Sequence, residues 1–593
     1  MRFCLTVAFT LMAGAALAQQ TADAVQPEGA TTGAALPASE RIAAAQAAKD
    51  AGQPVTAASY MVAAANPLAV QAGVDILAEG GTAADALVAV QTVLGLVEPQ
   101  SSGLGGGAFL VWYDAETKTL TTLDGRETAP LAATPQLFLK EDGEPMGFFD
   151  AVVGGRSVGT PGTPALLQEV HTRWGALAWP GLFDAAIDLA NGGFVVSPRL
   201  AGLVERDAER LSSYGETAAY FLPGGTPVAV GDVLVNAPYA QTLRAMAVGG
   251  ADAIYTGQIA ADIEDTVQRR TDNPGDLSQV DLSIYQVKER PPVCATYRAH
   301  DVCGMGPPSS GALTVGQILG MLDGYDLAAL GPDNAESWRL IGDASRLAFA
   351  DRGRYMADSD FVPMPTAGLV DTAYLAERAK ALSGETALSE TQPGTPAFDH
   401  SLNWADDQSI ELPSTSHISV VDSFGNVASM TTTIENAFGS RLMVHGFLLN
   451  NELTDFSFRS HRDGVPIANA LAPGKRPRSS MSPTIVMKDG APVLAIGSPG
   501  GSRIIGYTAK SIIAHLDWGM DVQQAVSLPH AVNRFGTFDV EEGTSAADLA
   551  PALEAMGFEV NVRGLNSGLH AIAIGDDLQG GADPRREGIA LGD

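Results

Sequence analysis

The sequence predicts an α+β protein, because helix and strand patterns fall in different parts of the chain. Residues 160–400 have mostly helical patterns with turn-rich connections, whereas paired strands are predicted before this part and after residue 413. Of the 593 residues, 46% are hydrophobic, and the mean hydropathy is +0.08. These values indicate a globular protein with a large core.

The charge balance limits the partners of the protein. The formal net charge is −32, from 68 acidic and 36 basic residues. Nucleic acids and anionic membranes bind basic patches, so we expect neither as a partner.

The N-terminus has the pattern of an export signal. Arg2 precedes an apolar run that ends in Ala16-Leu17-Ala18, which predicts a signal peptide over residues 1–18. We therefore expect an exported protein, periplasmic or secreted. No other stretch reaches about 18 apolar residues, so no membrane span is expected after signal removal. Residues 19–55 are rich in Ala, Thr and Gln and are interpreted as a flexible leader, although 42–49 could form a helix.

The first elements after the leader are two apolar helices. A proline starts the helix predicted over 67–78, and Thr82 caps the next one with Asp85 in the capping-box position. The glycine-rich loop 101–107 follows and leads into a strand. Dinucleotide-binding folds place such a loop between a strand and a helix, so this order argues against nucleotide binding.

The other helices and strands are predicted from the spacing of apolar residues along the chain. Helices are predicted over 200–211, 238–247, 260–269 and 336–355, and strands over 108–113, 121–123, 417–422, 426–434, 447–451, 482–488 and 492–498. Asp351 and Arg352 are interpreted as structural ion-pair candidates. Residues 393–413 have no apolar period and are expected to form a mobile tail.

Two cysteines remain beyond the signal peptide, Cys294 and Cys303. The segment between them turns at Arg298-Ala299, which places the two cysteines opposite each other in a hairpin. In an exported protein this spacing predicts a disulfide, and the alternative is a pair of buried free thiols.

The strand pair between residues 413 and 435 carries a possible nucleophile. The two strands are joined by a loop in which Gly425 takes the left-handed conformation. The resulting register places Thr415 opposite Thr433, with Glu435 on the same face as Thr433. A one-residue bulge would destroy this register.

A threonine hydroxyl is a weak nucleophile unless a base lies beside it. In an N-terminal threonine the α-amine, with a pKa of about 7.7–8.0, can be that base. Thr415 has a free α-amine only after the peptide bond between Ser414 and Thr415 is cleaved. Without such a cut, the segment is an ordinary strand with a surface threonine.

Further polar groups follow the later strands. Glu452 and Asp455 come after the strand 447–451. The adjacent glycines Gly500 and Gly501 precede a helix, where their N–H groups could bind an anion or simply form a turn. The nine histidines are scattered and no metal-ligand pattern occurs, so we expect neither a metal nor a cofactor.

Four motifs together resemble the small-subunit signature of the γ-glutamyltranspeptidases. They occur in the order P-S-T-S-H-I-S-V-V-D, N-N-E-L-T-D-F-S, K-R-P-R-S-S-M-S-P-T and G-S-P-G-G-S-R-I. The resemblance begins near Tyr60 and implies a four-layer αββα sandwich of the N-terminal-nucleophile hydrolase type, with a mainly helical large-subunit part. It also implies self-cleavage between Ser414 and Thr415 into a heterodimer of residues 56–414 and 415–593.

The resemblance implies a role for each site residue. The catalytic residues would be Thr415 as nucleophile, Thr433 as its hydrogen-bonding partner, and Gly500 and Gly501 as the oxyanion hole. The donor's α-carboxylate would be held by Arg126, Ser479 and Ser480, and its α-ammonium by Glu435, Glu452 and Asp455. The donors would be glutathione and other γ-glutamyl compounds, and the acceptors water or the amine of an amino acid or peptide.

The segment 456–478 departs from the family pattern. It lacks the tyrosine that covers the site in the enterobacterial type, it is shorter, and Arg478 stands where an apolar residue is usual. A more open site leaves a related amidase or acylase, of the cephalosporin acylase type, as an alternative. A second alternative is an uncleaved paralogue without activity.

Overall fold

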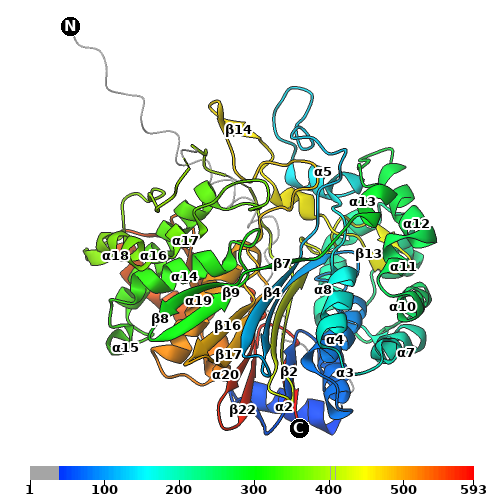
Figure 1. The fold of residues 1–593 in the computed structure, drawn as a ribbon, viewed down its shortest axis with the longest axis horizontal. Helices are drawn as coiled ribbons and strands as arrows, with labels where there is room; N and C mark the ends of the chain where they lie inside the picture. Colours follow the sequence, from blue (N-terminus) through cyan, green and yellow to red (C-terminus); the bar gives the residue numbers. More distant parts are fainter. Residues whose placement is uncertain (1–38, 401–402, 408) are drawn as a thin grey trace.

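The computed structural model describes residues 39–400, 403–407 and 409–593. Two seven-stranded sheets face each other, and helices cover both outer faces (Figure 1). This is the four-layer αββα arrangement, so the predicted fold class is confirmed.

The first sheet contains the strand pair that carries Thr433. Its strands lie in the order β23 (Ile589–Gly592), β2 (Met61–Ala64), β10 (Ser416–Val421), β11 (Val427–Thr433), β3 (Gly107–Asp114), β4 (Thr119–Gly125) and β7 (Lys288–Arg290). The second sheet has the order β1 (Val55–Ala57), β22 (Leu578–Ala582), β21 (His570–Ile574), β17 (Ala491–Gly497), β16 (Thr484–Lys488), β9 (His300–Gly304) and β8 (Val293–Tyr297).

Apolar side chains fill the space between the sheets. Met61 and Val111 of the first sheet pack with Ile485 and Ile572 of the second, and all four are fully buried. Because successive strand residues point to opposite faces, the other face of each sheet is free to bury its side chains under the helices.

The helices form the two outer layers. On the first sheet lie α3 (Pro67–Ala78) and α4 (Ala83–Val97), and α4 begins at the capping box of Thr82 and Asp85. The second sheet is covered by α14 (Gly311–Leu322), α16 (Ala335–Tyr355) and α19 (Ile504–Leu516). The other predicted helices are present as α8 (Pro198–Leu211), α10 (Ala237–Gly249) and α12 (Gly257–Gln268).

The register of the central hairpin is the predicted one. Ser416 pairs with Thr432 and Val421 with Val427, without a bulge. Gly425 in the loop has a φ of +86°, in the left-handed region. Thr415 and Thr433 therefore lie at the same end of the hairpin.

The predicted disulfide is also present. Cys294 on β8 pairs with Cys303 on β9, and their Cα atoms lie 4.1 Å apart. The connecting turn contains Arg298 and Ala299, both with positive φ.

The leader is more ordered than predicted. Helix α2 (Glu40–Asp50) packs against β23, and Lys49 Nζ donates hydrogen bonds to the carbonyl oxygens of Arg586 and Gly588 at 3.1 and 2.7 Å. The possible helix over 42–49 is therefore present as part of α2, and contacts distant in sequence stabilise it. The predicted signal peptide and residues 19–38 lie outside the described residues. Within the described ranges, no helix is long and apolar enough to cross a membrane.

Candidate active site

Thr415 and Thr433 meet at the end of the β10–β11 hairpin. Thr415 Oγ1 donates a hydrogen bond to Thr433 Oγ1 at 3.0 Å. The backbone N–H of Glu435 donates to the same Thr433 oxygen at 2.8 Å, which fixes the Thr433 hydroxyl from a second side. Both threonines are buried, so Thr433 orients the Thr415 hydroxyl in a site largely shielded from water.

The peptide bond before Thr415 is held in an unusual conformation. Thr415 has a φ of +93°, which is strained for a β-branched residue. The carbonyl oxygen of Ser414 accepts a hydrogen bond from the Gly500 N–H at 3.2 Å. On the other side, Arg586 Nη1 donates to the carbonyl oxygen of Thr415 at 3.0 Å. The bond thus combines backbone strain with a donor on its carbonyl oxygen, an arrangement suited to acyl transfer.

Gly500 and Gly501 form the loop that carries this donor. Their φ values are +136° and +58°, which side chains disfavour. A Cβ at Gly501 would lie 2.8 Å from the carbonyl oxygen of Leu412. A short 3₁₀ turn (Gly501–Arg503) and α19 follow directly, so the Gly500 N–H that donates to Ser414 lies just before a helix start, where negative charge is favoured.

Arg126 lies among acidic side chains. Its Nη2 donates to Asp455 Oδ2 at 2.5 Å, and its Nη1 donates to Glu452. Arg126 is fully buried and also donates to the carbonyl oxygens of Pro477 and Arg478, at 3.2 and 3.0 Å. The family resemblance implies that Arg126 binds the donor's carboxylate and that the two acids bind its ammonium. In the free site these groups pair with each other, because a buried guanidinium requires carboxylate partners.

A second charged group surrounds Ser480, and the sequence analysis missed two of its members. Ser480 Oγ donates to the carboxylate of Glu411, and Arg352 Nη2 donates both to Glu411 and, at 2.7 Å, to Ser480 Oγ. Both expected ion-pair candidates have charged partners: Arg352 pairs with Glu411, and Asp351 pairs with Arg378 at 3.3 Å and accepts from the Tyr374 hydroxyl at 2.6 Å. Neighbouring helix residues point about 100° apart, so Asp351 and Arg352 face different surroundings. The position of Glu411, just before the expected cut, was the available signal.

One cavity brings these groups together. It is lined by Arg126, Glu411, Leu412, Thr415, Thr433, Glu435, Glu452, Asp455, Ser479, Ser480, Met481, Gly501 and Ile504. Its volume is about 20 Å³, which is close to the space of a single water molecule. Glu411 and Leu412 therefore leave no room for a glutamyl group while the chain is uncut.

The comparisons with known proteins agree with this geometry. The family model described as Gamma-glutamyltranspeptidase matches residues 69–593. The chain belongs to the γ-glutamyltranspeptidase family. It is 37% identical to the glutathione hydrolase proenzyme of Bacillus subtilis (strain 168) over 548 residues, which cover 90% of this chain and 91% of that relative. It is 36% identical to the glutathione hydrolase proenzyme of Escherichia coli (strain K12), over 91% of this chain and 92% of the relative.

A solved structure is similar over almost the same length. The cephalosporin acylase from Bacillus halodurans matches with a TM-score of 0.81 and 27% identity, over 91% of this chain and 97% of that one. The predicted family is confirmed, and the chain is an enzyme with hydrolase and transferase activity. The alternative of a paralogue without activity is set aside.

Burial raises the pKa values of the acids around Arg126. Burial raises the pKa of Asp455 well above its usual range; Arg126 opposes this shift and Glu452 adds to it. Burial, followed by repulsion from Asp455 and Glu452, does the same to the pKa of Glu435. Burial alone would lower the pKa of Arg126, but the two adjacent carboxylates outweigh it and raise that pKa. Acids outnumber cations here, so a cationic ligand group would relieve the repulsion.

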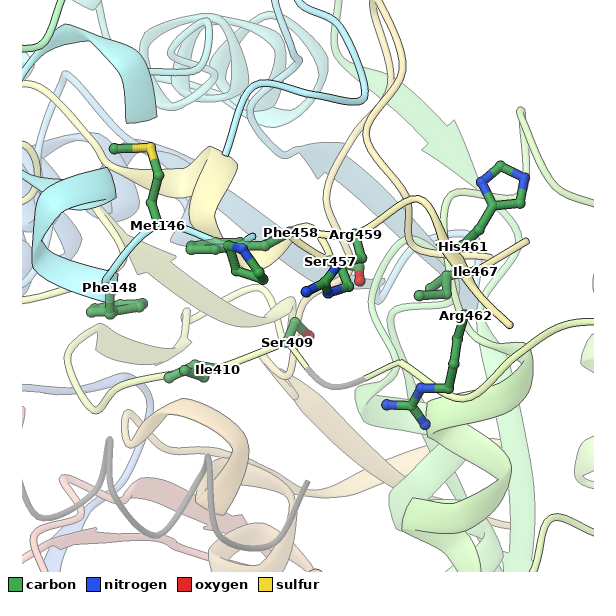
Figure 2. Close-up of a pocket in the computed structure, with 11 residues that line it drawn as sticks. Met146, Phe148, Ser409, Ile410, Ser457, Phe458, Arg459, His461, Arg462 and Ile467 are labelled. Atoms are coloured by element: carbon green, nitrogen blue, oxygen red, sulfur yellow. The ribbon is translucent and has the colours of Figure 1, made fainter. Parts of the chain in front are cut away.

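A second cavity, about 220 Å³ in volume, is lined in part by the segment that precedes Thr415 (Figure 2). It is lined by Pro145, Met146, Phe148, Ser409, Ile410, Ser457, Phe458, Arg459, His461, Arg462 and Ile467. Ser409 and Ile410 line this apolar cavity, and the next two residues line the catalytic pocket. The shortened segment 456–478 forms the opposite wall, with the hairpin β14 (His461–Arg462) and β15 (Val465–Pro466).

Proposed function

We propose that this enzyme is a self-processing γ-glutamyltransferase and glutathione hydrolase in which Thr415 is the nucleophile. In processing, Thr415 Oγ1 attacks the carbonyl carbon of Ser414 and forms an ester. The bond to the Thr415 nitrogen breaks, and that nitrogen takes a proton to become a free α-amine. Water then hydrolyses the ester, which leaves a carboxylate on Ser414 and a free hydroxyl on Thr415.

In turnover, the freed α-amine accepts the hydroxyl proton as Thr415 attacks the γ-carbonyl carbon of the donor. The leaving amine takes that proton and departs. Water or the amine of an amino acid or peptide then attacks the γ-glutamyl ester and releases glutamate or a transfer product. Gly500 and Gly501 stabilise the oxyanion in both steps.

Donor recognition in this proposal uses both charges of the glutamyl end. Glu435, Glu452 and Asp455 receive the α-ammonium, and the α-carboxylate is held by Arg126, Ser479 and Ser480, all of which line one pocket. A planar guanidinium can bind a carboxylate with two parallel hydrogen bonds. Glutathione, a γ-glutamyl compound with both charges, is the proposed donor.

The observation that carries the proposal is the environment of the bond before Thr415. The Thr415 hydroxyl donates a hydrogen bond to Thr433, and the Ser414 carbonyl oxygen accepts one from the Gly500 N–H. The backbone of Thr415 is strained. A surface threonine in an ordinary strand needs none of these features. We propose accordingly that residues 56–414 become the large subunit and 415–593 the small subunit of an exported enzyme, after removal of residues 1–18.

The Thr415→Ala variant tests this proposal. We expect it to remain one uncut chain without γ-glutamyl transfer, because it lacks the attacking oxygen, whereas Thr415→Ser should still be cut. Intact-mass measurement of the wild type should find a small chain that begins at Thr415. Cleavage of Thr415→Ala at the same bond would show that another group, or a protease, makes the cut.

An acylase that accepts donors without an α-amine is the second candidate, and the similarity to the cephalosporin acylase supports it. The acids around Arg126 support a γ-glutamyl donor. A glutaryl group lacks the α-ammonium that these acids would bind. Turnover of a γ-glutamyl anilide should therefore exceed that of the matching glutaryl anilide by orders of magnitude. Equal turnover would favour the acylase.

A further inference from the structure

Glu411 lies four residues before Thr415, and only 5% of it is exposed. Arg352 and Ser480 donate hydrogen bonds to different oxygens of its carboxylate. Arg352 also donates to Ser480 Oγ at 2.7 Å and, through Nε, to Ser310 Oγ at 2.8 Å. The carboxylate is thus held in a site built from side chains that are themselves fixed.

The surroundings of this carboxylate are cationic. Arg478 Nη2 lies 3.7 Å from Glu411 Oε1 and 2.8 Å from Asp407 Oδ2. Burial alone would raise the pKa of Glu411, but Arg352 and Arg478 outweigh it and lower that pKa. Asp455 lines the same pocket. Glu411 is therefore an ionised partner of two buried guanidinium groups.

A second anchor lies at the other end of the same short segment. Ser414 Oγ donates to the carbonyl oxygen of Gln100 at 3.0 Å, and the Ser414 carbonyl oxygen accepts from the Gly500 N–H at 3.2 Å. Only Leu412 and Pro413 separate the two anchors, and the proline ring fixes one of the few rotatable backbone bonds between them. The position of the Ser414 carbonyl carbon thus depends on the anchor at Glu411.

We propose that Glu411 is a positioning residue for self-cleavage: Arg352 and Ser480 hold its carboxylate so that the Ser414 carbonyl lies between Thr415 Oγ1 and the Gly500 N–H. This inference rests on the proposed function of Thr415. The rate of a reaction between two groups held in one molecule depends steeply on their distance and orientation. The same contact blocks donor binding in the uncut chain. Ser480, one of the groups proposed to bind the donor's carboxylate, is already hydrogen-bonded to Glu411. After the cut, Glu411 leaves with the end of the large subunit and has no part in turnover.

The rate of processing in Glu411→Gln tests this role. The amide keeps the shape of the side chain but loses the charge that binds two guanidinium groups. After protein synthesis is stopped, intact-mass measurements would follow the conversion of uncut chain to subunits. We expect a slowing of about tenfold or more, in line with the loss of charge-assisted hydrogen bonds, and a smaller loss in Glu411→Asp. The matched control is Glu390→Gln, an exposed residue just before residues 393–413, which should be cut at the wild-type rate.

Two further measurements separate positioning from support of the fold. The cut fraction of Glu411→Gln should have the kcat and KM of the wild type for a γ-glutamyl anilide, within about twofold. In the uncut Thr415→Ala background, Glu411→Gln should lower the thermal midpoint, because two buried guanidinium groups lose a partner, but the variant should stay fully folded at the temperature of the processing assay. Wild-type processing of Glu411→Gln would overturn the inference. A matching loss of kcat in the cut enzyme, or unfolding at the assay temperature, would also overturn it. A wild-type small chain that does not begin at Thr415 would instead overturn the proposed function.

Discussion

The two ends of the catalytic pocket differ in their balance of charge. At one end, a single guanidinium, Arg126, faces the carboxylates of Glu452 and Asp455, with Glu127 3.8 Å away. At the other end, Arg352 pairs with Glu411, and Arg478 lies 2.8 Å from Asp407 and 3.7 Å from Glu411, so two guanidinium groups face two carboxylates. Both ends are buried, so water screens these charges little.

This difference explains how one pocket serves two states of the chain. In the uncut enzyme, the cationic end is neutralised from within by Glu411, and the acidic end keeps a surplus of carboxyl groups. Under the proposed cut, the cationic end would lose Glu411, and Ser480 would be free to bind the donor's carboxylate together with Arg126, close to the acids proposed for its ammonium. The α-carbon of a γ-glutamyl donor carries these two groups.

Arg126→Lys should disturb the acidic end most strongly. Lysine keeps the charge but loses the planar fork that contacts two acids at once, so we expect KM for a γ-glutamyl anilide to rise about tenfold or more, for a loss of roughly 1.5–3 kcal/mol. A donor without the α-carboxylate should lose less. Arg339→Lys, a buried arginine paired with Glu336 on α16, is the matched control. Equal losses for both donors would mean that Arg126 only supports the structure.

The acidic end should also release protons when a donor binds. The raised pKa values of Glu435 and Asp455 keep their carboxyl groups protonated to higher pH than usual in the free site. An incoming ammonium lowers these pKa values, so binding releases protons and KM falls as pH rises through this range. Calorimetry of glutamate binding in buffers of different ionisation enthalpy would count the protons. A KM that rises with pH in this range would contradict the charge imbalance.

Water should reach the cationic end easily once the segment before the cut has left. Residues 409–412 separate the catalytic pocket from the apolar cavity, and the segment 456–478 lacks the covering tyrosine (Figure 2). Exclusion of water normally protects a reactive intermediate. We expect hydrolysis to remain a substantial fraction of turnover at saturating glycylglycine, and a γ-glutamyl oligopeptide to be accepted beside glutathione. Nearly pure transfer, with rejection of the larger donor, would indicate a cover formed elsewhere.

The two ends of the pocket also differ in how much of their structure the sequence predicts. The Thr415–Thr433 register follows from strand alternation, and the family resemblance points to Arg126, Glu452 and Asp455. The pairing of Arg126 with these acids was not predicted, because motifs do not show how side chains pair without a ligand. Glu411 was placed in a mobile tail, since residues 393–413 lack an apolar period. A single buried charge fixes that tail at its end, and periodicity does not detect such a contact.

The smallest effect on the pocket should come from the disulfide. Cys294→Ser with Cys303→Ser should cost about 2–3 kcal/mol of stability, as expected for a short closed loop, and lower the thermal midpoint. β9 continues toward Ser310, which binds Arg352, yet β9 is also held by β16, where Thr484 pairs with Gly304. Loosening the outer strand β8 should therefore leave KM within about twofold of the wild type.

A thiol-reactive label should not modify the unfolded, unreduced wild type after removal of residues 1–18. Two labelled cysteines would show that the bond is absent, and a large change in KM would show that the cationic end depends on the sheet edge.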